Sequence, residues 1–357
     1  MERINNLINI LNNKKIDGFL ITSEANITYL TGFTGDSSRL IVSPKGCTFM
    51  TDGRYTEQAQ LECHPKIEII KWINDERYGT KTYNRCIHDL NIKKLAFEGS
   101  VISYSTYQYL TQEVKGCELI PVDGVVEKLR LVKDEKEIEF LKEASKISDK
   151  ALELTVPYIK PGISEIEILA RLEFNLKTNG ADDLSFETMV LSGAKTSLLH
   201  GKADSKNIEK GDLVLFDFGA LYKGYHADIS RTFAVGTISS QQQEMYEVIQ
   251  KAQAEACNSI KAGVHGTIPD TTVRNIIPDK YIDYYYPGLG HGVGLVIHEE
   301  PFIKNTCDFI FKEGMVLTIE PGIYIPGIGG LRIEDTIVVK KNGFELLNKF
   351  PKDLKIL

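Results

Sequence analysis

Two aspartates, Asp217 and Asp228, lie in an apolar segment whose pattern predicts a hairpin. The segment LVLFDFGALYKGYHADISRTFAV (213–235) is expected to form two strands joined by a tight turn. A turn centred on Tyr222 and Lys223 pairs the aspartates directly, and a turn one residue later leaves them diagonal on the same face. Because like charges this close destabilise a sheet, the pair requires a cation, a shared proton or exposure to water. The apolar flanking residues make exposure the weakest of the three.

Two glutamates, Glu320 and Glu334, flank the centre of a second strand-loop-strand segment. The residues MVLTIEPGIYIPGIGGLRIEDTIVV (315–339) place two apolar runs around a loop rich in glycine and proline. Both glutamates are equally far from Gly327, so they are expected to face each other across the loop. Each follows an isoleucine, where a buried carboxylate is costly unless it is paired or binds a metal. Arg332 shares the strand face of Glu334 by alternation and is expected to hold one of the acids.

Two histidines lie between these two segments. In PGLGHGVGLVIHEEP (287–301), glycines around His291 permit the close approach of a ligand, and His298 is expected on a short apolar strand. A lone histidine in such a strand is usually a core residue, but four acids accompany these two. Four carboxylates and an imidazole suit Mn, with Co, Fe or Zn as alternatives, and differ from a thiolate zinc site. The set predicts two divalent metal ions, which can generate a nucleophile from water at neutral pH.

The elements that must position these residues are expected to form two domains, because 357 residues exceed the usual size of one hydrophobic core. Residues 1–125 alternate short apolar runs with amphipathic stretches, which predicts an α/β domain. Residues 126–357 predict an α+β domain, with helices covering one face of a mostly antiparallel sheet. Capping-box spacings at Asp134 and Ser164 predict the starts of two helices, and residues 241–260 predict the one helix that interrupts the later strands.

Composition and charge limit the kinds of partner and the cellular location that we expect for the protein. The formal charge is -7, and hydrophobic residues make up 42% of the chain, as in an ordinary globular protein. Such a chain offers no basic face to nucleic acid or to an anionic membrane, so a small or uncharged substrate fits better. No segment has the length of an apolar membrane span, and the N-terminus lacks the pattern of a signal peptide. Six scattered cysteines without paired spacing indicate a reducing compartment, so we expect a cytoplasmic protein.

The order of these motifs resembles that of the pita-bread metallopeptidases, and among them the Xaa-Pro aminopeptidases and prolidases. The resemblance rests on DFGALYKGYHADISRTF, GLGHGVGLVIHEEP, TIEPGIY and LRIED, and it covers essentially the whole chain. The stretches NITYLTGFTG (26–35) and MTDGRY (50–55) look like the creatinase/prolidase N-terminal domain, and FPKDL (350–354) is similar to a segment of the short bacterial Xaa-Pro peptidases. The resemblance implies a pita-bread catalytic domain over residues 126–357 and a creatinase/prolidase-type domain over residues 1–125.

The resemblance also implies a role for each acid and for one histidine. Asp217 would bind one metal ion, and Asp228 and Glu334 would bridge both. His291 and Glu320 would complete the shell of the other ion. Glu320 would in addition act as the general base.

Four further side chains are implied around the substrate. His200 matches a histidine that shuttles protons at the mouth of the site, and His298 matches one that hydrogen-bonds the scissile carbonyl. Arg332 and Tyr324 match groups that orient the metal ligands. Because the amide before a proline has no N–H, selection of proline requires a pocket shaped for its ring.

Two positions depart from the family pattern. Pro287 stands where the family usually has a further histidine, and Leu199 stands where many members have proline. Because a proline side chain neither donates nor accepts a hydrogen bond, the substrate-binding shell is altered while the metal set stays complete.

Three functions compete for these residues. We expect a Xaa-Pro aminopeptidase, which releases the N-terminal residue from peptides with proline second, and the resemblance implies a homodimer. A Xaa-Pro dipeptidase (prolidase) shares every ligand and differs in how the site mouth treats the chain beyond proline. A non-catalytic peptide-binding member of the fold is the third alternative, which the complete ligand set disfavours. The compact N-terminal domain and the context SGAKTSLLHGKAD favour the aminopeptidase.

Overall fold

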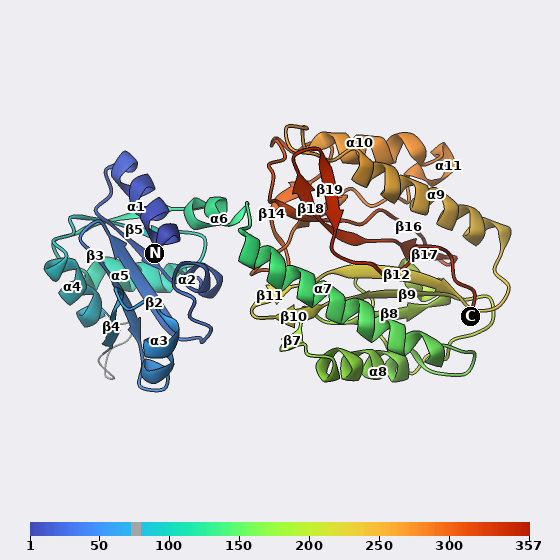
Figure 1. Ribbon diagram of the computed structural model, residues 1–357, viewed down its shortest axis with the longest axis horizontal. Coiled ribbons are helices and arrows are strands. Elements are labelled where there is room, and N and C mark those ends of the chain that lie inside the picture. The colour runs from blue at the N-terminus through green and yellow to red at the C-terminus, as the bar shows by residue number, and fades with distance from the viewer. Residues whose placement is uncertain (73–79) are drawn as a thin grey trace. The chain divides into compact units, whose positions relative to one another are not determined.

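The computed structural model describes residues 1–72 and 80–357, which form two compact units, Met1–Arg130 and Leu131–Leu357 (Figure 1). All six cysteines lie in the described ranges, and all are free thiols. Within those ranges, no helix combines the length and the apolar composition that crossing a bilayer requires.

The division between the units lies after Arg130 rather than after residue 125. Helix α6 (Val125–Arg130) is tied to the first unit at its end. The guanidinium of Arg130 donates to Oδ1 of Asn26 over 2.8 Å, and the hydroxyl of Tyr29 donates to the carbonyl of Leu129. Because of these contacts, the first unit extends five residues beyond the expected boundary.

The first unit is built on one six-stranded mixed sheet of order β4-β3-β2-β1-β5-β6. The pairs β1–β2 and β2–β3 are antiparallel, and the other three pairs are parallel. The strands are β1 (Gly18–Ile21), β2 (Ser38–Ser43), β3 (Gly46–Thr51), β4 (Glu68–Lys71), β5 (Lys94–Glu98) and β6 (Glu118–Val122). The helices before α6 are α1 (Glu2–Lys14), α2 (Glu24–Thr31), α3 (Thr56–Glu62), α4 (Thr80–Asp89) and α5 (Tyr104–Glu113).

Helices pack on both faces of this sheet because side chains alternate along its strands. Leu20, Ile41 and Met50 form a buried cluster with apolar residues of α4 and α5. Their strand neighbours Phe19 and Leu40 point to the opposite face and are equally buried, and α1 and α2 contact β2. The first unit is therefore an α/β domain, as the alternating apolar runs predict.

Two capped helices cover one side of the second unit, namely α7 (Glu135–Thr155) and α8 (Glu165–Thr178). The side chains of Asp134 and Ser164 accept from backbone N–H groups three residues on, and the glutamates there reach back to the cap. Both predicted helix starts are confirmed. The apolar faces of α7 and α8 pack in one core with residues of β8, β9 and β12.

Three more helices lie on the opposite side of the second unit, namely α9 (Ser240–Asn258), α10 (Thr267–Ile276) and α11 (Asp279–Ile282) (Figure 1). The prediction of one late helix covers α9 and is incomplete for the other two. The sequence of α10, TIPDTTVRNI, contains a proline and many β-branched residues, which lower helix propensity. Helix α10 nevertheless forms, because Val273 is buried in the core that α9 shares with the later strands.

Four antiparallel sheets lie between these helices, where the sequence predicts one sheet covered on a single face. Their orders are β11-β10-β7, β12-β9-β8, β14-β13-β15-β18-β19 and β16-β17. The first seven strands are β7 (Asp183–Leu184), β8 (Met189–Ser192), β9 (Leu213–Phe218), β10 (Ala220–Tyr222), β11 (Tyr225–His226), β12 (Ile229–Ala234) and β13 (Gly290–Gly292). The remaining strands are β14 (Glu299–Ile303), β15 (Val316–Ile319), β16 (Gly322–Ile325), β17 (Gly329–Arg332), β18 (Asp335–Lys340) and β19 (Gly343–Leu346).

The hairpin that carries the two aspartates turns one residue later than a centre at Tyr222 and Lys223. Asp217 pairs with Ser230 instead of with Asp228. The central residues of the turn are Lys223 and Gly224, with φ of 52° and 80°. A two-residue turn of this kind needs both residues in the left-handed region, where glycine is favoured and tyrosine is not. The alternative register, with both aspartates diagonal on one face, is the one that forms.

The second hairpin has the register that a centre at Gly327 predicts. Gly322 pairs with Arg332, and Ile319 pairs with Asp335 beyond an interruption of the strands. Glu320 and Glu334 occupy that interruption and face each other across it, as expected.

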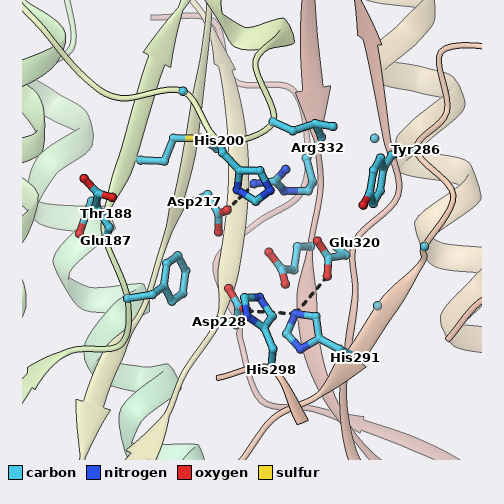
Figure 2. A pocket seen from close by; sticks show the side chains of 18 of the residues that line it. Glu187, Thr188, His200, Asp217, Asp228, Tyr286, His291, His298, Glu320 and Arg332 are labelled. Atoms are coloured by element: carbon cyan, nitrogen blue, oxygen red, sulfur yellow. Dashed lines mark hydrogen bonds and ion pairs between the residues drawn. The ribbon is translucent and has the colours of Figure 1, made fainter. Parts of the chain in front are cut away.

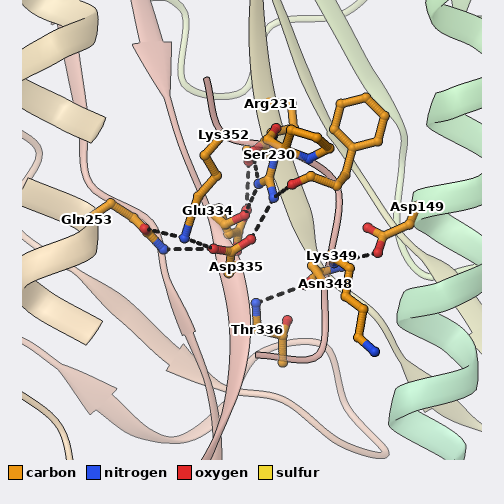
Figure 3. Close-up of polar contacts among 12 residues, drawn as sticks. Asp149, Ser230, Arg231, Gln253, Glu334, Asp335, Thr336, Asn348, Lys349 and Lys352 are labelled. Carbon is orange, nitrogen blue, oxygen red and sulfur yellow. Dashed lines mark hydrogen bonds and ion pairs between the residues drawn. The ribbon is translucent and has the colours of Figure 1, made fainter. Parts of the chain in front are cut away.

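A buried ion cluster ties the C-terminal segment to the strand after Glu334 (Figure 3). Asp335 is 1% exposed and receives Arg231 at 2.6 Å and Lys352 at 2.5 Å. Burial alone would raise the pKa of Asp335, but the two cations outweigh it and hold that pKa below its ordinary value. Arg231 also donates to the backbone carbonyls of Glu334 and Phe350. One guanidinium thus joins the second hairpin to the end of the chain.

We expect Lys352→Met to destabilise the second unit by about 1–3 kcal/mol, because it leaves buried Asp335 with one cation instead of two. The loss is measured as reduced amide hydrogen-exchange protection of β18. Lys349→Met, which removes a nearby exposed lysine, should change stability by less than about 0.5 kcal/mol. The single tryptophan, Trp72, reports unfolding of the first unit and should be unaffected. Equal losses in both variants would contradict the role given to Lys352.

Candidate metal centre and substrate pocket

The two hairpins and β13 bring the five predicted metal ligands to one place (Figure 2). Ligand atoms of Asp228, His291 and Glu334 all lie within 4.8 Å of one another. Nε2 of His291 is 3.6 Å from Oδ2 of Asp228 and 3.3 Å from Oε1 of Glu320. Asp217 completes the group from β9 and lines the same cavity.

Interruptions of the strands aim three of the four carboxylates at this centre. Asp228 lies between β11 and β12, Glu320 between β15 and β16, and Glu334 between β17 and β18. A residue outside the regular ladder can turn its side chain away from the pleat. The breaks in the strands therefore allow these carboxylates to reach the centre. They also explain why several sheets form where a single sheet was expected.

The close approach of the β13 backbone to β15 positions His291 at the centre. A Cβ built on Gly290 would lie 2.0 Å from the carbonyl oxygen of Thr318, so β13 can approach β15 only with glycine there. The backbone N–H of His291 then donates to the hydroxyl of Thr318 over 3.1 Å. Nδ1 of His291 lies 3.0 Å from the carbonyl of Gly292, which directs Nε2 toward the acids.

The carboxyl groups of the centre lie close together with too little positive charge nearby, and this shifts their pKa values. Burial, followed by the charges of neighbouring carboxylates, raises the pKa of Asp228 and of Glu334 well above their ordinary values. Burial also raises the pKa of Asp217. Burial opposes ionisation of Glu320 too, but its hydrogen bond to His291 lowers the pKa of Glu320 overall. A bound cation would relieve the repulsion among these groups.

The residues fit a divalent metal. Oε1 of Glu334 is buried and has no hydrogen-bond partner within the described part of the chain, while Oε2 accepts from Ser230 at 2.7 Å. An unsatisfied buried carboxylate oxygen is costly, and it points to a ligand that supplies positive charge. Carboxylate oxygens with one imidazole form the donor set of the harder divalent ions.

Arg332 contacts one carboxylate of the first pair, Asp217, rather than a glutamate of its own hairpin. Its guanidinium contacts Oδ2 of Asp217, donates to the hydroxyl of Tyr324 over 2.8 Å and donates to the hydroxyl of Ser230 over 2.7 Å. Burial would lower the pKa of Arg332, but the charge of Asp217 raises it well above its ordinary value. Burial also raises the pKa of Tyr324 to about 12, so the phenol keeps its proton.

Two hydroxyl groups that the sequence reading missed complete these contacts. Ser230 bonds both Glu334 and Arg332, and Thr318 donates to Oε1 of Glu320 over 3.0 Å. Ser230 lies two residues after Asp228, and Thr318 lies two residues before Glu320. Strand alternation places such neighbours on one face, so the period-two pattern could have identified both.

The two other predicted histidines, His200 and His298, also line the cavity (Figure 2). The rings of His291 and His298 meet edge to face with centroids 4.4 Å apart. His298 is exposed and lies in a bend before β14, so the expected short strand around it does not form.

The cavity measures about 730 Å³, and its walls carry aromatic and apolar side chains above the acidic floor. Pro287 lies in the wall between Tyr286 and Gly288, and Leu199 lies beside His200. Tyr285 anchors this wall, because its hydroxyl donates to buried Asp270 over 2.7 Å. The wall residues are Phe186, Met189, Leu199, Tyr286, Pro287, Phe302 and Ile303.

The chain is similar over its length to several known peptidases. It is 43% identical to a solved Xaa-Pro dipeptidase from Bacillus anthracis, with a TM-score of 0.96 and coverage of 100% of this chain and 99% of that one. It is 37% identical to a Xaa-Pro dipeptidase of Pyrococcus horikoshii, over 99% of this chain and 98% of the relative. A solved X-Pro aminopeptidase from Thermotoga maritima is 36% identical, with a TM-score of 0.91 and 99% of each chain covered.

Family descriptions match both parts of the chain. Residues 139–341 match metallopeptidase family M24, and residues 3–132 match the creatinase/prolidase N-terminal domain. The chain is therefore a metallopeptidase of family M24, with a creatinase/prolidase N-terminal domain ahead of a catalytic domain of the pita-bread fold.

Proposed function

We propose that this metallopeptidase is a Xaa-Pro dipeptidase that uses two divalent metal ions. The cluster of four carboxylates and His291 in one cavity, which includes the unsatisfied buried oxygen of Glu334, carries the proposal. Two relatives named Xaa-Pro dipeptidase favour this function over the aminopeptidase that the sequence led us to expect. The aminopeptidase remains the second candidate, since the similar Thermotoga maritima protein bears that name.

The five side chains at the centre divide naturally between two ions. In this proposal Asp217 would hold one ion, His291 and Glu320 would hold the second, and Asp228 and Glu334 would contribute to both. The oxygen-rich donor set supports Mn, with Co, Fe and Zn as alternatives. When bound, the ions would lower the pKa of water and polarise the scissile carbonyl.

The side chains around the centre account for the proton movements of amide hydrolysis. Glu320, whose lowered pKa keeps it ionised, accepts the proton of the attacking water. His298 donates a hydrogen bond to the carbonyl oxygen as negative charge develops there. His200, exposed at the mouth, supplies a proton to the departing proline nitrogen. Arg332 and Tyr324 hold the carboxylates in place throughout.

Two further properties belong to the same proposal. A cytoplasmic location suits six free cysteines, because thiols persist in reducing compartments. A homodimer rests on the family resemblance alone. Neither property is needed for the chemistry.

Replacing the carboxylate of Glu334 should reduce the amount of metal that the protein binds. Protein incubated with Mn and then desalted is expected to retain two ions per chain, whereas Glu334→Gln should retain one at most. Ion content is measured by mass spectrometry of the digested protein. Glu313→Gln, which changes an exposed glutamate outside the cavity, serves as the matched control and should retain the wild-type amount. Wild-type protein that binds no Mn would end the metal proposal.

Glu320→Gln should lower turnover roughly a hundredfold or more, because the amide cannot accept the proton of water. Circular dichroism should show an intact fold. Metal content measured on the same sample separates loss of the base from loss of a ligand. Activity within about threefold of the wild type would remove Glu320 from the base role.

Peptide length separates the two candidate functions. The Mn-loaded protein is expected to cleave Xaa-Pro dipeptides with a higher kcat/KM than Xaa-Pro-Xaa tripeptides of the same first residue. Release of the first amino acid is followed by chromatography. Cleavage of tripeptides alone would replace the dipeptidase with the aminopeptidase.

A further inference from the structure

The cationic side chains that line the cavity differ in whether they are already paired with other residues. Arg332 is buried and committed to Asp217, Ser230 and Tyr324. Lys202 lies at the rim, where its ammonium pairs with Glu187 at 2.7 Å. Arg332 is therefore committed, whereas Lys202 is engaged in an exposed ion pair on the surface.

Lys304, like Lys202, lines the cavity and is exposed, but it differs from Lys202 in its pairing. Among the described residues, its ammonium has no hydrogen-bond or ion-pair partner. A lysine in this position is free to bind an anion that enters the cavity.

Strand pairing brings Lys304 near the metal centre. It directly follows β14, whose last residue Ile303 pairs with Gly290, the neighbour of His291. The backbone N–H of Leu289 donates to the carbonyl of Ile303 over 2.9 Å. By alternation Lys304 shares a strand face with Phe302, and both line the cavity beside the wall that contains Pro287.

The substrate of a dipeptidase carries a negative charge that such a cation can bind. A Xaa-Pro dipeptide carries a free carboxylate on the proline, close to the bond that breaks. The acidic floor of the cavity repels that carboxylate, and Pro287 offers it neither charge nor a donor. An ammonium group beside the aromatic wall would hold it away from the acids and orient the proline ring.

We propose that Lys304 binds the C-terminal carboxylate of the dipeptide and thereby sets the preference for dipeptides over longer chains. The inference rests on the proposed dipeptidase function and names the residue that determines its specificity. A longer peptide lacks a charge at this place, because its proline carboxyl is an amide.

The test compares Xaa-Pro with Xaa-Pro-NH2, which differ only in this charge. Lys304→Met should raise KM for the free acid roughly tenfold to a hundredfold, while kcat stays within about threefold. Its KM for the amide should not change. Lys304→Arg should keep most of the preference for the acid. Lys341→Met, at an exposed lysine outside the cavity, controls for loss of a positive charge.

The outcomes separate this inference from the function on which it rests. If the wild type cleaves Xaa-Pro and Lys304→Met keeps the acid-to-amide ratio, the role of Lys304 is overturned and the dipeptidase stands. The same holds if Lys202→Met, and not Lys304→Met, removes the preference. If the wild type cleaves no Xaa-Pro dipeptide, the proposed function fails and the inference fails with it.

Discussion

The gathering of four carboxylates around one imidazole, with two of the acids buried and two half-buried, is the constraint on which the second unit depends. Acids so close together repel one another, and burial raises the pKa of Asp228 and Glu334 well above their ordinary values. The fold tolerates them because each lies beside a polar or cationic side chain. Arg332 faces Asp217, Ser230 faces Glu334, and Thr318 with His291 faces Glu320. Nε2 of His291 also lies 3.6 Å from Oδ2 of Asp228. The remaining repulsion is what a divalent cation would neutralise.

One hairpin serves both the centre and the core. Glu334 lies in the break before β18, and the adjacent acid Asp335 begins that strand. Glu334 turns toward the other carboxylates, while Asp335 is neutralised by Arg231 and Lys352 against α9. Arg231 also donates to the carbonyl of Glu334, so the outer ion cluster fixes the backbone of a proposed metal ligand. Catalytic geometry and stability therefore share the same few residues.

The sequence predicts the centre well where local rules decide. Symmetry about Gly327 fixes the second hairpin, and two capping boxes fix the starts of α7 and α8. The first hairpin differs by one residue, because the left-handed turn requires Gly224 at its second central position. Helix α10 escapes prediction because tertiary packing overrides its poor propensity. The availability of Lys304 depends on which partners fold nearby, and no local pattern reports that.

The bonds that Arg231 makes to the carbonyls of Phe350 and Pro351 have a consequence for biosynthesis. The same guanidinium holds the backbone of Glu334, so the centre has its complete support only when residues 350–352 are present. Because these residues follow all the other residues of the centre in the chain, the first unit can fold on the ribosome before the support of the centre has been synthesised. The centre therefore gains its complete support only after residues 350–352 have been made.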